Sequence, residues 1–161
     1  MSGNSTPEQR LAELGFTLPT PMNTGNLPFD LVRIDDNRIF LSGHVPLADD
    51  GSLAKPLGKV GSDLTAEQGH AAAQRTALGL FASLKAALGE LDRVTGWLRV
   101  FGMVNVAPGF NALPGVINGA SLLILDVFGP TRGAHTRSAV GMAELPFGVP
   151  VEIEAEVSIR P

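Results

Sequence analysis

The 161-residue sequence contains no cysteine, which excludes disulfides, thiol catalysis and metal–thiolate sites. It also lacks a basic cluster, because its 12 Lys and Arg residues are scattered among 16 Asp and Glu residues and the formal net charge is −4. Proteins that bind nucleic acid usually present clustered basic side chains. RNA or DNA is therefore disfavoured as an obligate partner.

Long apolar runs are also lacking, and no segment is expected to cross a bilayer. Residues 1–5 have neither the basic start nor the apolar stretch of a secretory signal peptide. Hydrophobic residues make up 44% of the chain, which is enough for one buried core. We therefore predict a single cytoplasmic domain over residues 1–161, with a short helical extension at its N-terminus.

Helices are predicted from two capping boxes, in which a hydroxyl residue is followed three positions later by glutamine. Thr6 precedes a short helix that ends near Gly15, and Thr65 precedes a longer one that ends near Leu88. A further helix is predicted over about residues 114–128, where Gly-Pro follows. Apolar residues at helical spacing predict the buried faces of the two long helices: Ala73, Ala77, Leu80, Phe81, Leu84 and Leu88, then Val116, Ala120, Leu123, Ile124, Val127 and Phe128.

Strands are predicted where apolar and polar residues alternate. Residues 31–34 and 38–41 flank an Asp-Asp-Asn turn, and a long strand is expected over residues 94–105. In that long strand, alternation groups Trp97 with Arg99, Phe101 and Met103 on one face. Two strand-like runs within residues 136–157, joined by a Pro/Gly turn, are expected to form a closing hairpin.

The predicted order of elements is β-β-α-β-α-β-β with a short helix in front. This order favours an α+β fold in which one mixed sheet carries both main helices on one face. The other face needs a cover, because Phe40 and the side chains grouped with Trp97 are large. Self-association is the simplest cover for such an apolar sheet face.

The closing segment carries the strongest candidate for a binding site. Along residues 151–157 the apolar side chains share one face, so Glu152, Glu154 and Glu156 share the other. Arg137 lies in the strand-like run before them, and a guanidinium binds carboxylates through two parallel hydrogen bonds. Arg137 could equally pair with surface glutamates, and strand periodicity does not choose among the three carboxylates.

Three segments of the chain resemble the RidA (YjgF) family. The C-terminal signature combines Arg137-Ser138, Leu145-Pro146 and the Glu-x-Glu of residues 151–155. Residues 38–43 resemble the second strand of the family and residues 97–101 its central strand. The resemblance covers roughly residues 28–160 and implies a chorismate-mutase-like fold, a homotrimer, and ligand pockets between subunits.

The resemblance also implies an activity, the hydrolysis of reactive imines and enamines such as 2-aminoacrylate to 2-keto acids and ammonia. No metal or organic cofactor is needed. Arg137 corresponds to the arginine that holds the substrate carboxylate, and Glu152 to the glutamate that positions or activates water. The other pocket residues implied are Phe29, Ser42, Asn118 and Ala139, while His44 and His135 lie at strand ends where either could touch a ligand.

The chain departs from the family pattern at several of these positions. Phe29 replaces a tyrosine and so removes a hydroxyl, Ala139 replaces a common cysteine, and His44 replaces a common glutamine. The stretch 104–110 differs from the usual acidic loop, and the loop at 45–63 is longer. These differences leave the substrate within this reaction class open.

Three other functions are weighed against the deaminase. A non-catalytic trimeric protein that binds or senses small carboxylates is credible because the tyrosine hydroxyl is missing. Ribonuclease activity or translation inhibition, names that the family sometimes carries, fits poorly with the acidic balance. A chorismate mutase would need more convergent cations for its dianionic substrate, and fold alone does not imply function.

Overall fold

The computed structural model describes residues 5–161, so the signal-peptide prediction falls almost entirely outside the described residues. Two short 3₁₀ turns, at Leu91–Arg93 and Pro146–Gly148, accompany the main elements. The order of helices and strands is the predicted one. These elements are α1 (Pro7–Glu13), β1 (Val32–Asp35), β2 (Arg38–His44), α2 (Ala66–Leu88), β3 (Val94–Asn105), α3 (Leu113–Arg132), β4 (Thr136–Met142) and β5 (Val151–Ile159).

The helices α1 and α2 begin at their predicted caps and α2 ends at Leu88 as predicted, whereas α3 begins without a side-chain cap and extends past its predicted end. The hydroxyl of Thr6 accepts a hydrogen bond from the backbone N–H of Gln9, and both helix starts close a full capping box. Gly89, with φ 85°, ends α2 in a conformation that favours glycine. In α3 the helical backbone breaks at Gly129, where φ is 80° and ψ is 171°, and one more turn leads to Arg132.

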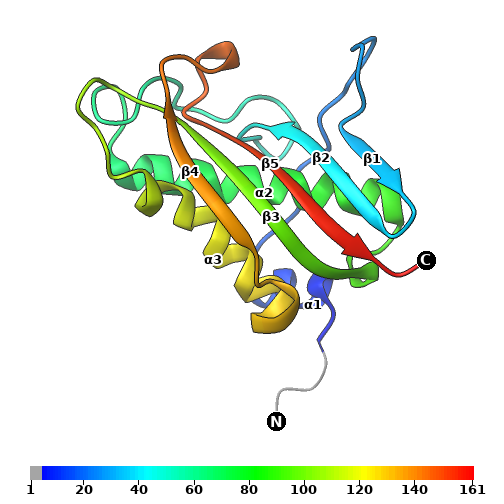
Figure 1. Cartoon of the computed structure of the whole chain (residues 1–161). Helices are drawn as coiled ribbons and strands as arrows, with labels where there is room; N and C mark the ends of the chain where they lie inside the picture. The colour runs from blue at the N-terminus through cyan, green and yellow to red at the C-terminus, as the bar shows by residue number, and fades with distance from the viewer. Residues whose placement is uncertain (1–4) are drawn as a thin grey trace.

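The five strands form one mixed sheet in the order β1-β2-β5-β3-β4 (Figure 1). β3 pairs in parallel with β4, and the other neighbours are antiparallel. The predicted closing hairpin is therefore wrong, because β3 lies between β4 and β5. The alternation of apolar and polar residues predicts which face of the sheet each side chain occupies, but it does not predict which strands pair. Here α3 connects β3 to β4 so that the two strands run parallel.

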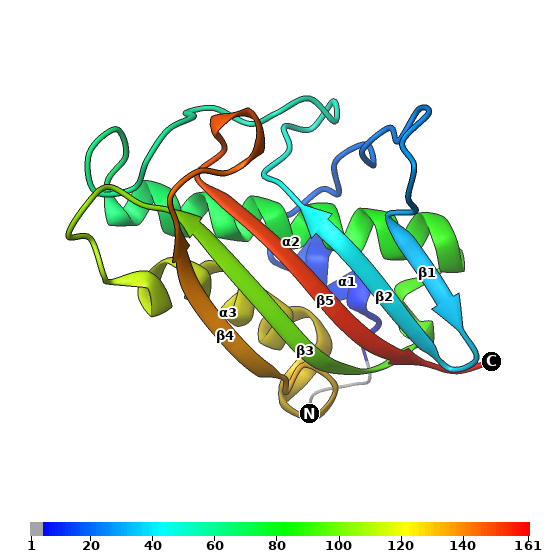
Figure 2. The same cartoon turned by 45° about the horizontal axis from the view of Figure 1, so that its top comes forward.

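Both α2 and α3 cover one face of the sheet, as predicted, and the core lies between these two layers (Figure 2). Every residue of the two predicted apolar stripes is buried. Phe81, Trp97 and Phe128 meet edge to face at the centre, with ring centroids 5.3–5.6 Å apart. The helix-facing side of the sheet is therefore completed within one chain.

The predicted facing of Trp97 is wrong. The pairing of β3 with β5 shifts register between Trp97 and Arg99, so Trp97 turns into the helix-facing core while Arg99 and Phe101 stay on the other side. A bulge of this kind moves one side chain to the opposite face. The open face of the sheet still carries large side chains, among them Phe40, which is 39% exposed.

Two connecting segments, residues 45–63 and 143–150, lie together at one end of the sheet (Figure 2). The backbone N–H of Gly58 donates to the carbonyl of Gly148 across 2.7 Å. Lys59 donates to Asn105 Oδ1 at 2.9 Å and to the carbonyl of Ala143. A second apolar cluster fills the space beneath them, comprising Val45, Leu47, Met103, Leu145 and Val149.

The expectation that no segment could cross a bilayer needs a correction. By length and composition α3 is long and apolar enough to do so. One side of α3, which includes Ile117, Leu123 and Ile124, nevertheless lies in the core against α2 and the sheet, whereas Leu122 and Leu125 are exposed. A long core helix rich in apolar residues meets the same criterion of length and hydropathy as a membrane-spanning helix.

Candidate active site

The predicted site residues form two groups on opposite faces of the sheet. Arg137 pairs with Val100 and lies in the same cross-strand row as Ala155, both of which face the helices. Glu152 pairs with Met103 on the open face. Successive residues of a strand alternate between faces, so the two groups are separated by the sheet itself.

The first group surrounds Arg137 at the edge strand β4. Its Nη1 donates to Asn118 Oδ1 at 2.7 Å and to Ser121 Oγ at 3.1 Å, and both acceptors stand on α3. Asn118 and Ser121 are one helical turn apart, which places both on the side of α3 that faces β4. Ala139 follows on the same face of β4 and packs against the core. The structure thus brings together the predicted Arg137, Asn118 and Ala139.

His135 completes this group two residues before Arg137. Its Nε2 lies 2.9 Å from Ser121 Oγ and its Nδ1 lies 2.7 Å from the carbonyl oxygen of Gly133. Sequence reasoning placed His135 near the pocket but missed Ser121. The available signal was the spacing of Asn118 and Ser121 at i and i+3 on one helix.

The second group surrounds Glu152 on β5. Gly43 of β2 lies against it so closely that a Cβ at that position would stand 2.8 Å from the Glu152 Cδ. The neighbouring Ser42 donates its hydroxyl hydrogen to the carbonyl of Asp30 at 2.7 Å. Phe29, which precedes Asp30, is 52% exposed. The second group therefore combines Glu152 of β5 with Ser42 at the end of β2 and Phe29 in the segment that enters β1.

Burial is the main cause of an altered pKa at Glu152. Partial removal from water disfavours the carboxylate and raises the pKa of Glu152, and the charge of Glu154 raises it further. A carboxyl group of this kind exchanges protons closer to neutral pH than an exposed one. Glu152 is therefore suited to act as a general base, whereas the neighbouring Glu154 forms an ion pair with Arg99 at 3.4 Å.

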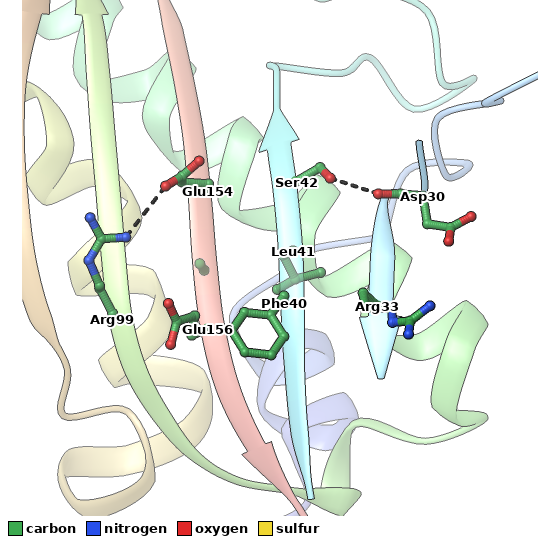
Figure 3. A pocket seen from close by; sticks show the side chains of 9 residues that line it. Asp30, Arg33, Phe40, Leu41, Ser42, Arg99, Glu154 and Glu156 are labelled. Atoms are coloured by element: carbon green, nitrogen blue, oxygen red, sulfur yellow. Dashed lines mark hydrogen bonds and ion pairs between the residues drawn. The ribbon is translucent and has the colours of Figure 1, made fainter. Parts of the chain in front are cut away.

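A cavity on the open face lies beside the second group (Figure 3). Ser42 lines it, but Arg137 and Glu152 do not. Its charged lining comprises the cations of Arg33 and Arg99 and the carboxylates of Asp30, Glu154 and Glu156. Carboxylates outnumber cations in this cavity, so within one chain it is not suited to a small anion.

His44 does not reach either group as a ligand-binding residue. Its side chain is completely buried, with Nδ1 2.6 Å from the carbonyl oxygen of Ser42 and Nε2 2.8 Å from Ser83 Oγ. Burial lowers the pKa of His44, although the bond to Ser42 opposes that shift. The side chain thus supports the backbone of Ser42 from within the core.

Comparison with known proteins places this architecture in a family. The family model described as "YjgF/chorismate mutase-like, putative endoribonuclease" matches residues 8–149. That match spans most of the chain, from α1 to the turn before β5. The protein belongs to the YjgF/chorismate-mutase-like family.

Individual relatives agree with this assignment. Protein TCP17 of Trypanosoma cruzi is 43% identical over 123 residues, which cover 76% of each chain. The crystal structure of Atu1372 from Agrobacterium tumefaciens, a protein of unknown function, superposes with a TM-score of 0.87 at 40% identity and covers 96% of this chain and 92% of its own. A Shewanella oneidensis structure described as a "putative endoribonuclease" gives 0.89 at 30% identity, with 96% and 100% covered.

Proposed function

We propose that the protein hydrolyses small reactive 2-imino acids, and the enamines in equilibrium with them, to 2-keto acids and ammonia without a cofactor. One observation carries the proposal: a held guanidinium and a half-buried carboxylate with a raised pKa occupy the two positions of the family signature. Arg137 would bind the substrate carboxylate, and its planar fork suits that group.

In the proposed reaction, Glu152 accepts a proton from water as the oxygen bonds to the imine carbon. The imine enters protonated at nitrogen, so this addition gives a neutral carbinolamine. Its nitrogen then takes the proton back from Glu152, and ammonia leaves as the hydroxyl proton passes to Glu152 and the keto group forms. Water is the only co-reactant, so no oxidant or metal is required. An enamine substrate first gains a proton from solvent at its β-carbon and becomes the protonated imine.

The active site of this proposal needs a second copy of the chain, because Arg137 and Glu152 lie on opposite faces of one sheet. The open face, with Phe40 and Phe101, offers the apolar surface for such packing. We place the site between subunits of a homotrimer, with Arg137, Asn118 and Ala139 from one subunit. Glu152, Ser42 and Phe29 would come from its neighbour.

Subunit mixing tests this arrangement. Arg137→Ala and Glu152→Gln variants are each expected to lose activity toward enzymatically generated 2-aminoacrylate. When they are refolded together at equal amounts, random assembly leaves about a quarter of the sites with both native residues, so activity should return to that level. As a control, mixing Arg137→Ala with Asn118→Ala should restore none, because both changes damage the same group.

A wild-type protein that does not accelerate 2-keto acid release would contradict the proposal. A protein that binds pyruvate through Arg137 but does not turn over 2-aminoacrylate would instead be a binding or regulatory protein. This second function is supported by Phe29, whose ring offers no hydroxyl to a substrate or water. Cleavage of RNA fits poorly with the row of carboxylates on the open face.

A further inference from the structure

His135 holds Ser121 in one orientation. The carbonyl oxygen of Gly133, 2.7 Å from Nδ1, can only accept a hydrogen bond, so Nδ1 carries the proton. In the neutral ring Nε2 is then an acceptor, and Ser121 Oγ, 2.9 Å away, donates its only hydrogen to it. A protonated ring would instead direct a second cationic donor at the oxygen that already faces Arg137.

Ser121 in turn orients Arg137. Because its hydrogen points to His135, the lone pairs of Ser121 Oγ are left for Arg137 Nη1, 3.1 Å away. The second hydrogen of Nη1 goes to Asn118 Oδ1 at 2.7 Å. Both Nη1 hydrogens are thereby committed. Among residues 5–161, no protein acceptor is bonded to Nε or Nη2 of this side chain.

We propose that His135 and Ser121 are positioning residues that fix the Arg137 guanidinium, so that its Nε–Nη2 edge receives the substrate carboxylate side-on. That a substrate carboxylate is the ligand rests on the proposed function, whereas the hydrogen bonds from His135 to Ser121 and from Ser121 to Arg137 do not depend on it. An arginine loses much rotamer freedom when it is held, and holding it before the ligand arrives removes that cost from binding. We call the hydrogen bonds that link His135, Ser121 and Arg137 the relay. By occupying Nη1, the relay also selects which edge of the guanidinium faces the ligand.

The relay can be tested without any ligand. In protein labelled with ¹⁵N in histidine and arginine, long-range ¹H–¹⁵N NMR at mildly alkaline pH should show His135 protonated at Nδ1 and not at Nε2. The Nη hydrogens of Arg137 should be resolved in the wild type and averaged by rotation in Ser121→Ala and in His135→Gln. An Nε2-protonated ring, or unchanged Arg137 signals in both variants, would overturn the proposal.

Binding of pyruvate, a stable 2-keto acid, provides the second measurement. Each single change, Ser121→Ala or His135→Gln, should raise the Kd about tenfold, as expected for the loss of one hydrogen bond to a charged group. The double variant Ser121→Ala/His135→Gln should bind pyruvate with the same Kd as Ser121→Ala alone. Neither change should have an effect in the Arg137→Ala background, because both act through that residue.

The matched control is His70→Gln. The Nδ1 of His70 lies 3.0 Å from the carbonyl oxygen of Gly115 and links α2 to α3 without touching Arg137. The His70→Gln variant should bind pyruvate with the Kd of the wild type. Additive losses in the double variant, or equal losses in His70→Gln, would assign a merely structural role to the pair. Wild-type protein that fails to bind pyruvate would contradict the proposed function, while the NMR measurement would still decide on the relay.

Discussion

The absence of a side chain at Gly43 leaves the space in which the Glu152 carboxyl group lies. A Cβ there would stand 2.8 Å from Cδ and 3.0 Å from Oε1 of Glu152. The family signature identifies the glutamate, but nothing in the sequence marks Gly43 as its neighbour across β2 and β5. Contacts between residues more than one hundred positions apart depend on strand order, which local patterns do not contain.

Replacing Gly43 with alanine should displace Glu152 and reduce turnover of 2-aminoacrylate about a hundredfold, the order of loss expected for a misplacement near one ångström. Pyruvate binding through Arg137 should change far less. Steady-state kinetics and a pyruvate titration measure the two effects. Gly115→Ala is the control, because a Cβ at Gly115 meets nothing within 4 Å; similar turnover in both variants would contradict this account of Glu152.

Burial of His44 should make the stability of the protein depend on pH. The pKa of His44 in the folded protein lies below its ordinary value of 6.5, so the unfolded chain binds more protons between these two values. The free energy of unfolding should therefore fall as the pH drops below about 6.5, until the pKa of the folded state is reached. Urea unfolding at a series of pH values measures this.

A His44→Gln variant should lose most of this pH dependence, and His70→Gln should keep it. Glu152 contributes the opposite sign: its pKa is raised in the folded protein, so ionisation above about 4.5 lowers stability. Measurements between pH 5.5 and 7.5 on the Glu152→Gln background isolate the histidine. A His44→Gln protein with the wild-type slope would refute the assignment.

At the scale of elements, the crossing of α2 and α3 depends on one close approach. A Cβ at Gly119 of α3 would stand 2.0 Å from the backbone carbonyl oxygen of His70 in α2. This atom belongs to a helix backbone and cannot rotate away. The helices themselves were predictable from caps and apolar spacing, because those signals are local. The need for glycine at one position of α3 arises only where the two helices meet.

Gly119→Ala should therefore separate the helices and lower the free energy of unfolding by about 1–3 kcal/mol, or more if the backbone cannot shift. Gly115→Ala, one turn earlier on the same helix, should leave it unchanged or raise it slightly, since alanine favours helix over glycine. Chemical denaturation of both variants gives the comparison. Equal free energies of unfolding for Gly119→Ala and Gly115→Ala would contradict this account, because they would show that α2 and α3 can shift apart at His70 without loss of stability.

At the scale of the whole molecule, the open face of the sheet is the surface through which we propose that three chains assemble. Phe101 lies on it opposite Glu154, with the Arg99 guanidinium 5.3 Å from its ring centroid. Phe101→Glu would place two carboxylates across from each other on a face that we propose to be buried between subunits. The expected result is dissociation of the trimer to monomers, with the circular dichroism of a folded chain.

Size-exclusion chromatography with light scattering measures the change, and the wild type should show three times the mass of one chain. Leu122→Glu is the matched control, because Leu122 is an exposed apolar residue on α3 rather than on the open face. That variant should remain trimeric. A monomeric wild type, or a trimeric Phe101→Glu, would contradict the proposed assembly.

Local chemistry in the sequence determined the helix starts at Thr6 and Thr65, the extent of β3 and the apolar stripes, because capping and periodicity act over a few residues. Tertiary structure alone decided that β3 separates β4 from β5, that a bulge turns Trp97 inward, and which face of the sheet each side chain occupies. The family signature identifies Arg137 and Glu152 as a pair. Their placement on opposite faces follows from long-range strand pairing, which no short pattern encodes.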